Sequence, residues 1–207
     1  MKSQLKTWLV LGSLMMSSQL FAQQAPNTSA TPAQTATAIF AGGCFWCVEA
    51  DFEKLPGVVA AESGYTGGKT VNPTYEQTNT GNTGHTEAVR ITYDPAKVSY
   101  VSLLDHFWKN IDPTVKNRQF CDVGSQYRSA LFYQNEMEKK AIETSKAGIL
   151  NAGRIKEIHT EIAPATAFYP AEEYHQDYYK KNPVRYKFYR TGCGRDKRLS
   201  EIWGSKD

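Results

Sequence analysis

The sequence predicts an α/β protein in which helices pack on one mixed β-sheet and a long irregular segment follows at the C-terminal end. Apolar strand patterns recur along the chain, and amphipathic helical patterns lie between them. After the last strand pattern, residues 171–204 are rich in aromatic and charged side chains without a sustained period. Strands and helices mixed in this order favour a sheet with helices packed on it.

The elements follow from local patterns. The first strand ends at a pair of glycines, and the first helix stops at Pro56 and Gly57. Residues 72–86, between the second and third strands, are predicted to form either a loop or a short helical turn. A loop of the length of 112–128 is often functional. Strands are expected at 37–43, 58–68, 87–94, 129–133 and 155–163, and helices at 44–55, 99–111 and 135–152.

The N-terminal part of the chain is expected to lie outside the fold. Residues 1–22 combine two lysines, a short apolar run and a small residue at Ala22, which is the anatomy of a secretory signal peptide. An N-terminal membrane anchor is the alternative. Residues 23–37 are polar and poor in large apolar side chains, so they are expected to form a flexible leader. Residues 38–207 then form a single domain.

The net charge of the chain argues against nucleic acids and anionic membranes as partners. The chain has 207 residues and a net charge of +3, and residues 1–22 carry two lysines and no acid, which leaves +1 after their removal. A nearly neutral protein has no strong electrostatic reason to bind nucleic acid or an anionic membrane. No apolar seam suggests a partner subunit, so a monomer is expected.

Cys44 is a candidate nucleophile among four cysteines. It lies at the expected strand-to-helix junction, where free helix amides favour a negative charge. Cys47 follows three residues later, and the other two cysteines are isolated in sequence. Structural disulfides, or a buried structural Cys44 beside aromatic residues, are the alternatives.

Glu87 is a candidate acid. It shares one face of its expected strand with Val89, Ile91 and Tyr93, and that face is otherwise apolar. Burial disfavours the charged form of a carboxyl group, and a carboxyl that stays protonated near neutral pH can act as a general acid. The alternative is a solvated residue at a frayed strand end.

Seven motifs in order resemble the peptide methionine sulfoxide reductase A family: GCFWC, SGYTGG, NPTYEQ, GHTEAV, YDP, DVGSQYRS and AEEYHQDYY. The resemblance covers about residues 40–183. It implies a two-layer α/β sandwich, reduction of the S epimer of methionine sulfoxide, and no bound metal or organic cofactor. The substrates it implies are oxidised proteins or peptides and free methionine sulfoxide.

The resemblance also implies roles for residues at matching positions. Cys44 is the nucleophile, and Glu87 protonates the sulfoxide oxygen. Phe45 and Trp46 form walls for the substrate methyl group, and the residues that help to bind the oxygen are Tyr75, Asp122 and Tyr127. Attack on the sulfoxide leaves a sulfenic acid on Cys44, which a second cysteine converts to a disulfide.

The sequence leaves the identity of the resolving cysteine open, because Cys47, Cys121 and the tail depart from the common family pattern. Cys193 ranks first, since its glycine-flanked segment is expected to be mobile; Cys47 ranks second and Cys121 third. His85 and His175 are expected to border the site at most. The tail tyrosines are expected to serve in packing.

Two rival functions remain at this stage. An exported thiol–disulfide oxidoreductase would use Cys44 and Cys47 as its dithiol. A zinc-stapled binding module would use all four cysteines, although a four-cysteine zinc site usually has two close pairs and this chain has one. If residues 1–22 direct export, the enzyme is expected in the periplasm with a thioredoxin-like dithiol as its electron donor.

Overall fold

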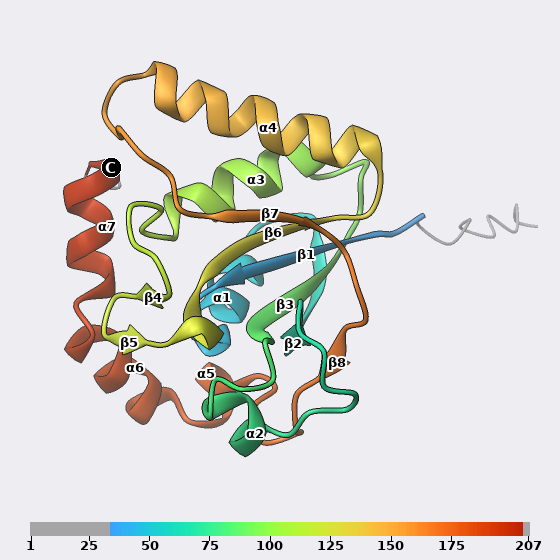
Figure 1. The fold of residues 1–207 in the computed structure, drawn as a ribbon, viewed down its shortest axis with the longest axis vertical. Helices are drawn as coiled ribbons and strands as arrows, with labels where there is room; N and C mark the ends of the chain where they lie inside the picture. The colour runs from blue at the N-terminus through green and yellow to red at the C-terminus, as the bar shows by residue number, and fades with distance from the viewer. Residues whose placement is uncertain (1–33, 205–207) are drawn as a thin grey trace, which may run out of the picture. The chain divides into compact units, whose positions relative to one another are not determined.

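A mixed β-sheet of six strands, in the order β7-β6-β1-β3-β2-β8, is the centre of the computed structural model, which describes residues 34–204 (Figure 1). Neighbouring strands run antiparallel except β6 and β7, which are parallel. The strands are β1 (Ala36–Gly42), β2 (Val58–Thr66), β3 (Thr86–Tyr93), β6 (Ser129–Tyr133), β7 (Glu161–Pro164) and β8 (Tyr169–Pro170).

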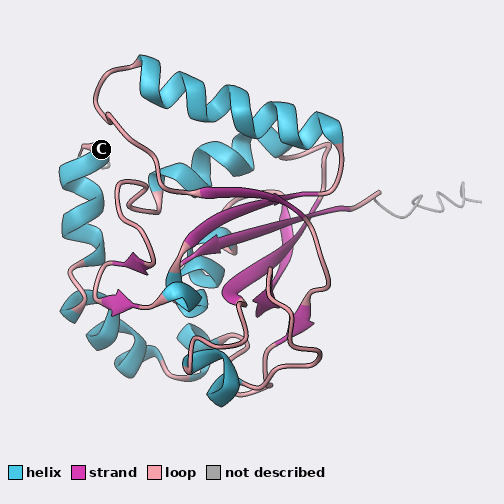
Figure 2. Ribbon diagram, in the orientation of Figure 1, coloured by secondary structure: helices cyan, strands magenta, loops and turns pink. Residues whose placement is uncertain are grey.

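Helices α1 (Phe45–Phe52), α3 (Tyr100–Lys109) and α4 (Glu136–Asn151) form the second layer. α1 contacts β1, β2 and β3, while α3 lies between β1 and α4. Figure 2 shows α4 as the outermost helix of this layer. The mixed sheet with helices packed on it confirms the predicted fold class.

Alternation along the strands builds the core between the two layers. Phe40 of β1 is completely buried, and its ring stacks on those of Phe52 and Phe107 with centroids 5.1 and 5.4 Å away. Val89 and Ile91 of β3 lie on the same side. Because strand residues two apart share a face, Glu87 also points to the helical layer, as predicted.

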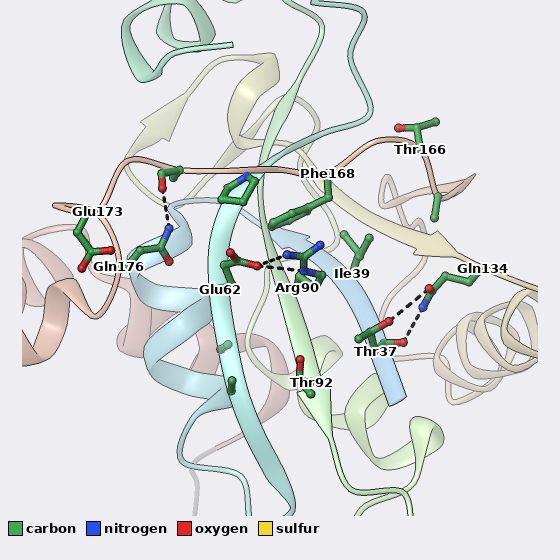
Figure 3. Close-up of a pocket in the computed structure, with 15 residues that line it drawn as sticks. Thr37, Ile39, Glu62, Arg90, Thr92, Gln134, Thr166, Phe168, Glu173 and Gln176 are labelled. Carbon is green, nitrogen blue, oxygen red and sulfur yellow. Dashed lines mark hydrogen bonds and ion pairs between the residues drawn. The ribbon is translucent and has the colours of Figure 1, made fainter. Parts of the chain in front are cut away.

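The opposite face of the sheet is only partly covered. A small cluster around Ile39 and Phe132 packs under residues 163–168. Beside it lies a hollow of about 780 Å³ (Figure 3). Arg90 crosses this hollow, pairs with Glu62 and stacks against the ring of Phe168 at 4.7 Å. The hollow contains no cysteine, and its charged pair is already satisfied.

The C-terminal segment is more regular than predicted. It contains α5 (Tyr178–Lys181), α6 (Pro183–Gly192) and α7 (Arg195–Trp203), and the last two are full helices. Figure 1 shows them along one side of the sheet. α6 begins with Pro183 at its first position, where the missing amide costs no hydrogen bond.

Two other expectations need correction. The predicted strand 155–163 pairs only from Glu161, because Ile155 and Ile158 are buried in the core without joining the sheet. The predicted loop 112–128 contains a small hairpin and a short 3₁₀ helix: β4 (Arg118–Gln119), β5 (Asp122–Val123) and η1 (Ser125–Tyr127).

At the N-terminal side, β1 begins at Ala36, two residues before the expected start of the domain. The expected signal peptide, 1–22, lies outside the described residues, as does most of the expected leader. Across residues 34–204, every helix is too short or too polar to cross a bilayer.

Candidate active site

Cys44 is the N-terminal cap of α1, at the end of the turn that follows β1. Gly43 makes this turn with φ of +84°, a conformation that favours glycine. A Cβ atom at Gly43 would lie 2.5 Å from the Cβ of Gln119, so a side chain has no room. The turn therefore places the Cys44 thiol at a strand-to-helix junction, as the sequence predicts.

Glu87 lies opposite this junction, near the start of β3. Its carboxylate accepts a hydrogen bond of 2.9 Å from the backbone amide of Phe45. This amide is the first of α1, so the unpaired donor at the helix start goes to Glu87. Only 2% of Glu87 is exposed, which excludes the alternative of a solvated strand end.

Cys44 and Glu87 share a cavity of about 60 Å³. Every residue predicted for catalysis or substrate binding lines it, although these residues come from five elements and the turn before α1. Tyr189 of α6 also lines it, and sequence reasoning missed this residue. The lining residues are Cys44, Phe45, Trp46, Tyr75, Glu87, Asp122, Tyr127 and Tyr189.

Burial determines the protonation state of Glu87 in this cavity. Desolvation raises the pKa of Glu87 to about 8, although the hydrogen bond from Phe45 acts in the opposite direction. The nearby charge of Asp122 adds to the increase. Glu87 is therefore protonated at neutral pH and can give a proton to an oxygen in the cavity.

The candidate nucleophile, Cys44, rests as a thiol. Burial raises the pKa of Cys44 well above its usual value, and the charges of Cys47 and Glu87 raise it further. The sequence suggested that the helix start favours the thiolate of Cys44. In the structure the Phe45 amide is instead directed to Glu87, so this donor does not offset the desolvation of the sulfur.

One wall of the cavity is aromatic. The indole of Trp46 stacks on Tyr178 with centroids 3.7 Å apart and donates a hydrogen bond of 3.0 Å to Nδ1 of His175. His175 also packs against the ring of Phe45, with centroids 5.0 Å apart. His175 thus borders the site and holds the orientation of Trp46, within the role expected from the sequence.

Tyr75 opens α2 (Tyr75–Asn79) on another side of the cavity. Thr74 and Gln77 form a reciprocal capping box at the helix start, and the backbone amide of Tyr75 donates to the carboxylate of Glu172 at 2.9 Å. Burial raises the pKa values of Tyr75 and Tyr127. Both phenols therefore stay protonated and can donate to an oxygen.

Residues 36–207 match the family model described as peptide methionine sulfoxide reductase. The chain belongs to this family.

Relatives and solved structures agree with this assignment. Peptide methionine sulfoxide reductase MsrA of Bacillus licheniformis is 52% identical over 170 residues, which cover 82% of this chain and 94% of the relative. The MsrA of Bacillus subtilis is 51% identical, covering 82% and 96%. Methionine sulfoxide reductase A of Corynebacterium diphtheriae has a similar structure, with a TM-score of 0.66, 38% identity, and coverage of 75% and 78%. The reduced form of Mxr1 from Saccharomyces cerevisiae has a TM-score of 0.69 and 33% identity, covering 74% and 89%.

The chain is thus a peptide methionine sulfoxide reductase, an oxidoreductase that reduces methionine sulfoxide. A sulfoxide oxygen is a poor leaving group until it is protonated. The cavity offers the two groups that such a reduction needs, which are a sulfur nucleophile and an uncharged acid.

Two of the four cysteines of this reductase form a disulfide, and the other two are free thiols. Cys121, which is exposed, forms a disulfide with Cys193, while Cys44 and Cys47 are free and buried. The predicted mobility of the segment around Cys193 is therefore wrong for this state: Cys193 caps α6 and is bonded to Cys121. This pairing also leaves no cluster of four thiolates for the zinc-stapled module.

Cys47 lies one turn along α1 from Cys44, within hydrogen-bonding reach of it. The contact with Cys44 and the positive charges of Arg195 and Arg190 lower the pKa of Cys47 to about 7, against the effect of burial. Cys47 can therefore carry negative charge beside Cys44. This makes it the closest thiol partner for an oxidised Cys44 in the described structure.

The sequence did not predict how His85 and Tyr189 lie relative to the cavity. His85 does not line the cavity. Its ring accepts a hydrogen bond from the backbone amide of Gly68 and contacts the carbonyl oxygen of Thr70, so it stabilises a glycine turn. Tyr189 was expected only to pack. It reaches the cavity from α6, and no local pattern in the sequence indicated this position.

Proposed function

We propose that this reductase acts on the S epimer of methionine sulfoxide, free or in proteins, with Cys44 as the nucleophile and Glu87 as the acid. The shared 60 Å³ cavity carries this proposal, because it brings a thiol and a buried carboxyl group to one small space. The hydroxyls of Tyr75 and Tyr127, together with Asp122, surround the place for the sulfoxide oxygen. Phe45 and Trp46 line the place for the methyl group.

The reaction transfers one oxygen atom. Glu87 gives its proton to the sulfoxide oxygen, and the Cys44 thiolate attacks the activated sulfur centre. Attack forms a transient bond between the two sulfur atoms. The hydroxyl group then passes from the substrate sulfur to the Cys44 sulfur while this bond and the original sulfur–oxygen bond break, so Cys44 becomes a sulfenic acid and methionine leaves. Cys44 supplies both electrons, so no step draws on a bound metal or organic group.

We infer that Cys47 is the first thiol to resolve this sulfenic acid. Condensation gives a Cys44–Cys47 disulfide and water. Cys193, which the sequence ranked first, becomes available only when its bond to Cys121 is reduced. It is then a second resolving thiol, with exposed Cys121 as its partner toward an external reductant.

A thioredoxin-like dithiol is the proposed electron donor, because thiol–disulfide exchange needs an attacking dithiol and an accessible disulfide. Mxr1 of Saccharomyces cerevisiae has been solved in complex with Trx2.

We also propose that residues 1–22 direct export, that the mature enzyme is a periplasmic monomer, and that it repairs oxidised exported proteins. N-terminal sequencing of the protein recovered from cell fractions tests the proposed periplasmic location. A cytosolic protein that retains residues 1–22 would refute it.

The deciding experiment assays each epimer of a methionine sulfoxide substrate separately. Wild type, Cys44→Ser and Glu87→Gln are compared. Cys44→Ser should lose all turnover, and Glu87→Gln should lose about 100-fold or more, the usual range for a positioned acid. Activity on the R epimer alone, or full activity of Cys44→Ser, would refute the proposal.

A further inference from the structure

The hydroxyl of Tyr189 lies between Cys44 and Asp122. It donates a hydrogen bond of 2.5 Å to Oδ2 of Asp122. The same hydroxyl is within hydrogen-bonding reach of the Cys44 side chain. All three side chains line the one cavity. Because the phenol proton points to Asp122, the phenol oxygen is free to accept a proton from the thiol.

The proposed reaction needs such a path. Cys44 rests as a thiol and must lose a proton to become a nucleophile. Glu87 rests as a protonated acid and must keep its proton for the sulfoxide oxygen. Glu87 therefore cannot accept the proton of Cys44 before it has given up its own. A second acceptor that contacts the Cys44 side chain solves this conflict.

We propose that Tyr189 and Asp122 accept the proton of Cys44, with Tyr189 as the relay and Asp122 as the final base. The Cys44 proton moves to the phenol oxygen as the phenol proton moves to Oδ2 of Asp122. Tyr189 stays neutral, Cys44 becomes a thiolate, and Asp122 becomes a carboxylic acid. After Glu87 has protonated the oxygen, one proton returns from Asp122 to Glu87, which balances the cycle. The assignment rests on the proposed role of Cys44.

The fold holds this relay at both ends. Asp122 directly follows Cys121, and Tyr189 accepts a backbone hydrogen bond of 2.9 Å from Cys193. The Cys121–Cys193 disulfide therefore joins the two segments that carry the relay. The ring of Tyr189 also packs edge-on against Trp46, with centroids 5.8 Å apart. These contacts fix the phenol without using its hydroxyl.

The surrounding charges are compatible with a proton on Asp122. Burial raises the pKa of Asp122, while the Tyr189 hydroxyl and Arg195 act in the opposite direction. The other titratable groups that act on Cys44 or line its cavity are Cys47, Glu87, Tyr75 and Tyr127. Asp122 is the carboxylate that the Tyr189 hydroxyl contacts, so it is the base at the end of this path.

Two measurements on Tyr189→Phe and Asp122→Asn test the relay. The first is the pH dependence of Cys44 alkylation by iodoacetamide in a Cys47→Ala background with the Cys121–Cys193 disulfide intact, where Cys44 is the single free thiol of the chain. The second is the rate of methionine release in one turnover, before any reductant is added. Tyr186→Phe is the matched control, because Tyr186 lies on α6 but its hydroxyl contacts Arg190.

Tyr189→Phe should shift the alkylation profile of Cys44 to higher pH and slow methionine release about 10-fold or more, as expected for loss of a positioned proton acceptor. Asp122→Asn should do the same, and the double variant should be no slower than the slower single variant, because both changes break one path. Tyr186→Phe should match wild type. An unchanged profile and rate in Tyr189→Phe, or losses that multiply in the double variant, would overturn the relay. Neither result would affect the role of Cys44, which Cys44→Ser tests separately.

Discussion

The backbone amide of Phe45 donates its hydrogen bond to the carboxylate of Glu87, 42 positions away in the chain, at 2.9 Å. This bond joins the first turn of α1 to β3, so Cys44, which precedes Phe45, and Glu87 share one rigid frame. Because the acceptor is a carboxyl group with a pKa of about 8, the state of this bond depends on pH in the working range.

The first prediction concerns the pH dependence of catalysis. In the proposed mechanism, sulfoxide reduction needs protonated Glu87, so the rate of methionine release should fall as pH rises through about 8. Glu87→Gln should be slow and show no such decrease. Alkylation of Cys44 should still rise with pH in both proteins, because it needs only the thiolate. A wild-type rate that keeps rising above pH 9 would contradict the acid role.

The second prediction concerns stability. The pKa of Glu87 rises from 4.5 to about 8 on folding, so the folded state binds the proton more tightly than the unfolded state. The free energy of unfolding should therefore fall as pH rises from about 4.5 through about 8. Glu87→Gln should show a shallower decrease in urea titrations across this range. Glu136→Gln, an exposed surface change, should keep the wild-type slope.

The third prediction separates the resolving thiols. Cys47→Ser should release the first methionine at the wild-type rate but accumulate a sulfenic acid on Cys44, because its closest thiol partner is gone. A dimedone adduct on Cys44, measured by mass spectrometry, reports this species. Cys193→Ser should form little adduct. The reverse pattern would restore Cys193 as the first resolving cysteine.

The fourth prediction concerns the disulfide. Cys121 and Cys193 are separated by 72 positions, and closing a loop of this length stabilises a folded protein by about 4 kcal/mol in the chain-entropy account. The double variant Cys121→Ser/Cys193→Ser should lose a stability of this order in urea denaturation. Wild type unfolded with excess dithiothreitol should resemble the variant. Equal stability with and without reductant would show that the bond adds nothing.

The fifth prediction concerns the aromatic wall. Trp46→Ala removes the indole that stacks on Tyr178 and lines the cavity. The KM for a methionine sulfoxide peptide should rise about 10-fold, because burial of the substrate methyl group loses its main apolar contact. Tyr133→Leu on β6, which does not line the cavity, is the matched control. A rise in KM of equal size in that control would indicate a general loss of packing.

Much of the site could be predicted because strand alternation and motif order both constrain it. Glu87 lies on an apolar strand face, and Cys44 follows a glycine turn; both features are local in sequence. Tyr189 could not be placed in the same way, since its neighbours in the cavity come from α1, β3 and the hairpin. Only the packing of α6 against these elements brings it there.

The same distinction applies to the fold. The strands and the long helices carry their own periodic patterns, so their positions could be predicted. The β7 error arose because Ile155 and Ile158 are buried by α-layer packing and produce an apolar alternation without a strand partner. The pairing of Cys121 with Cys193 depends on how α6 returns to the hairpin, which no local pattern specifies.

The volume of the catalytic cavity has a consequence for the enzyme's clients. A space of about 60 Å³ holds the tip of one side chain and excludes a polypeptide backbone. A damaged residue must therefore protrude from its own protein before it can enter. For methionines buried in a client, access depends on local opening of that client, and the speed of repair will follow the client's own fluctuations.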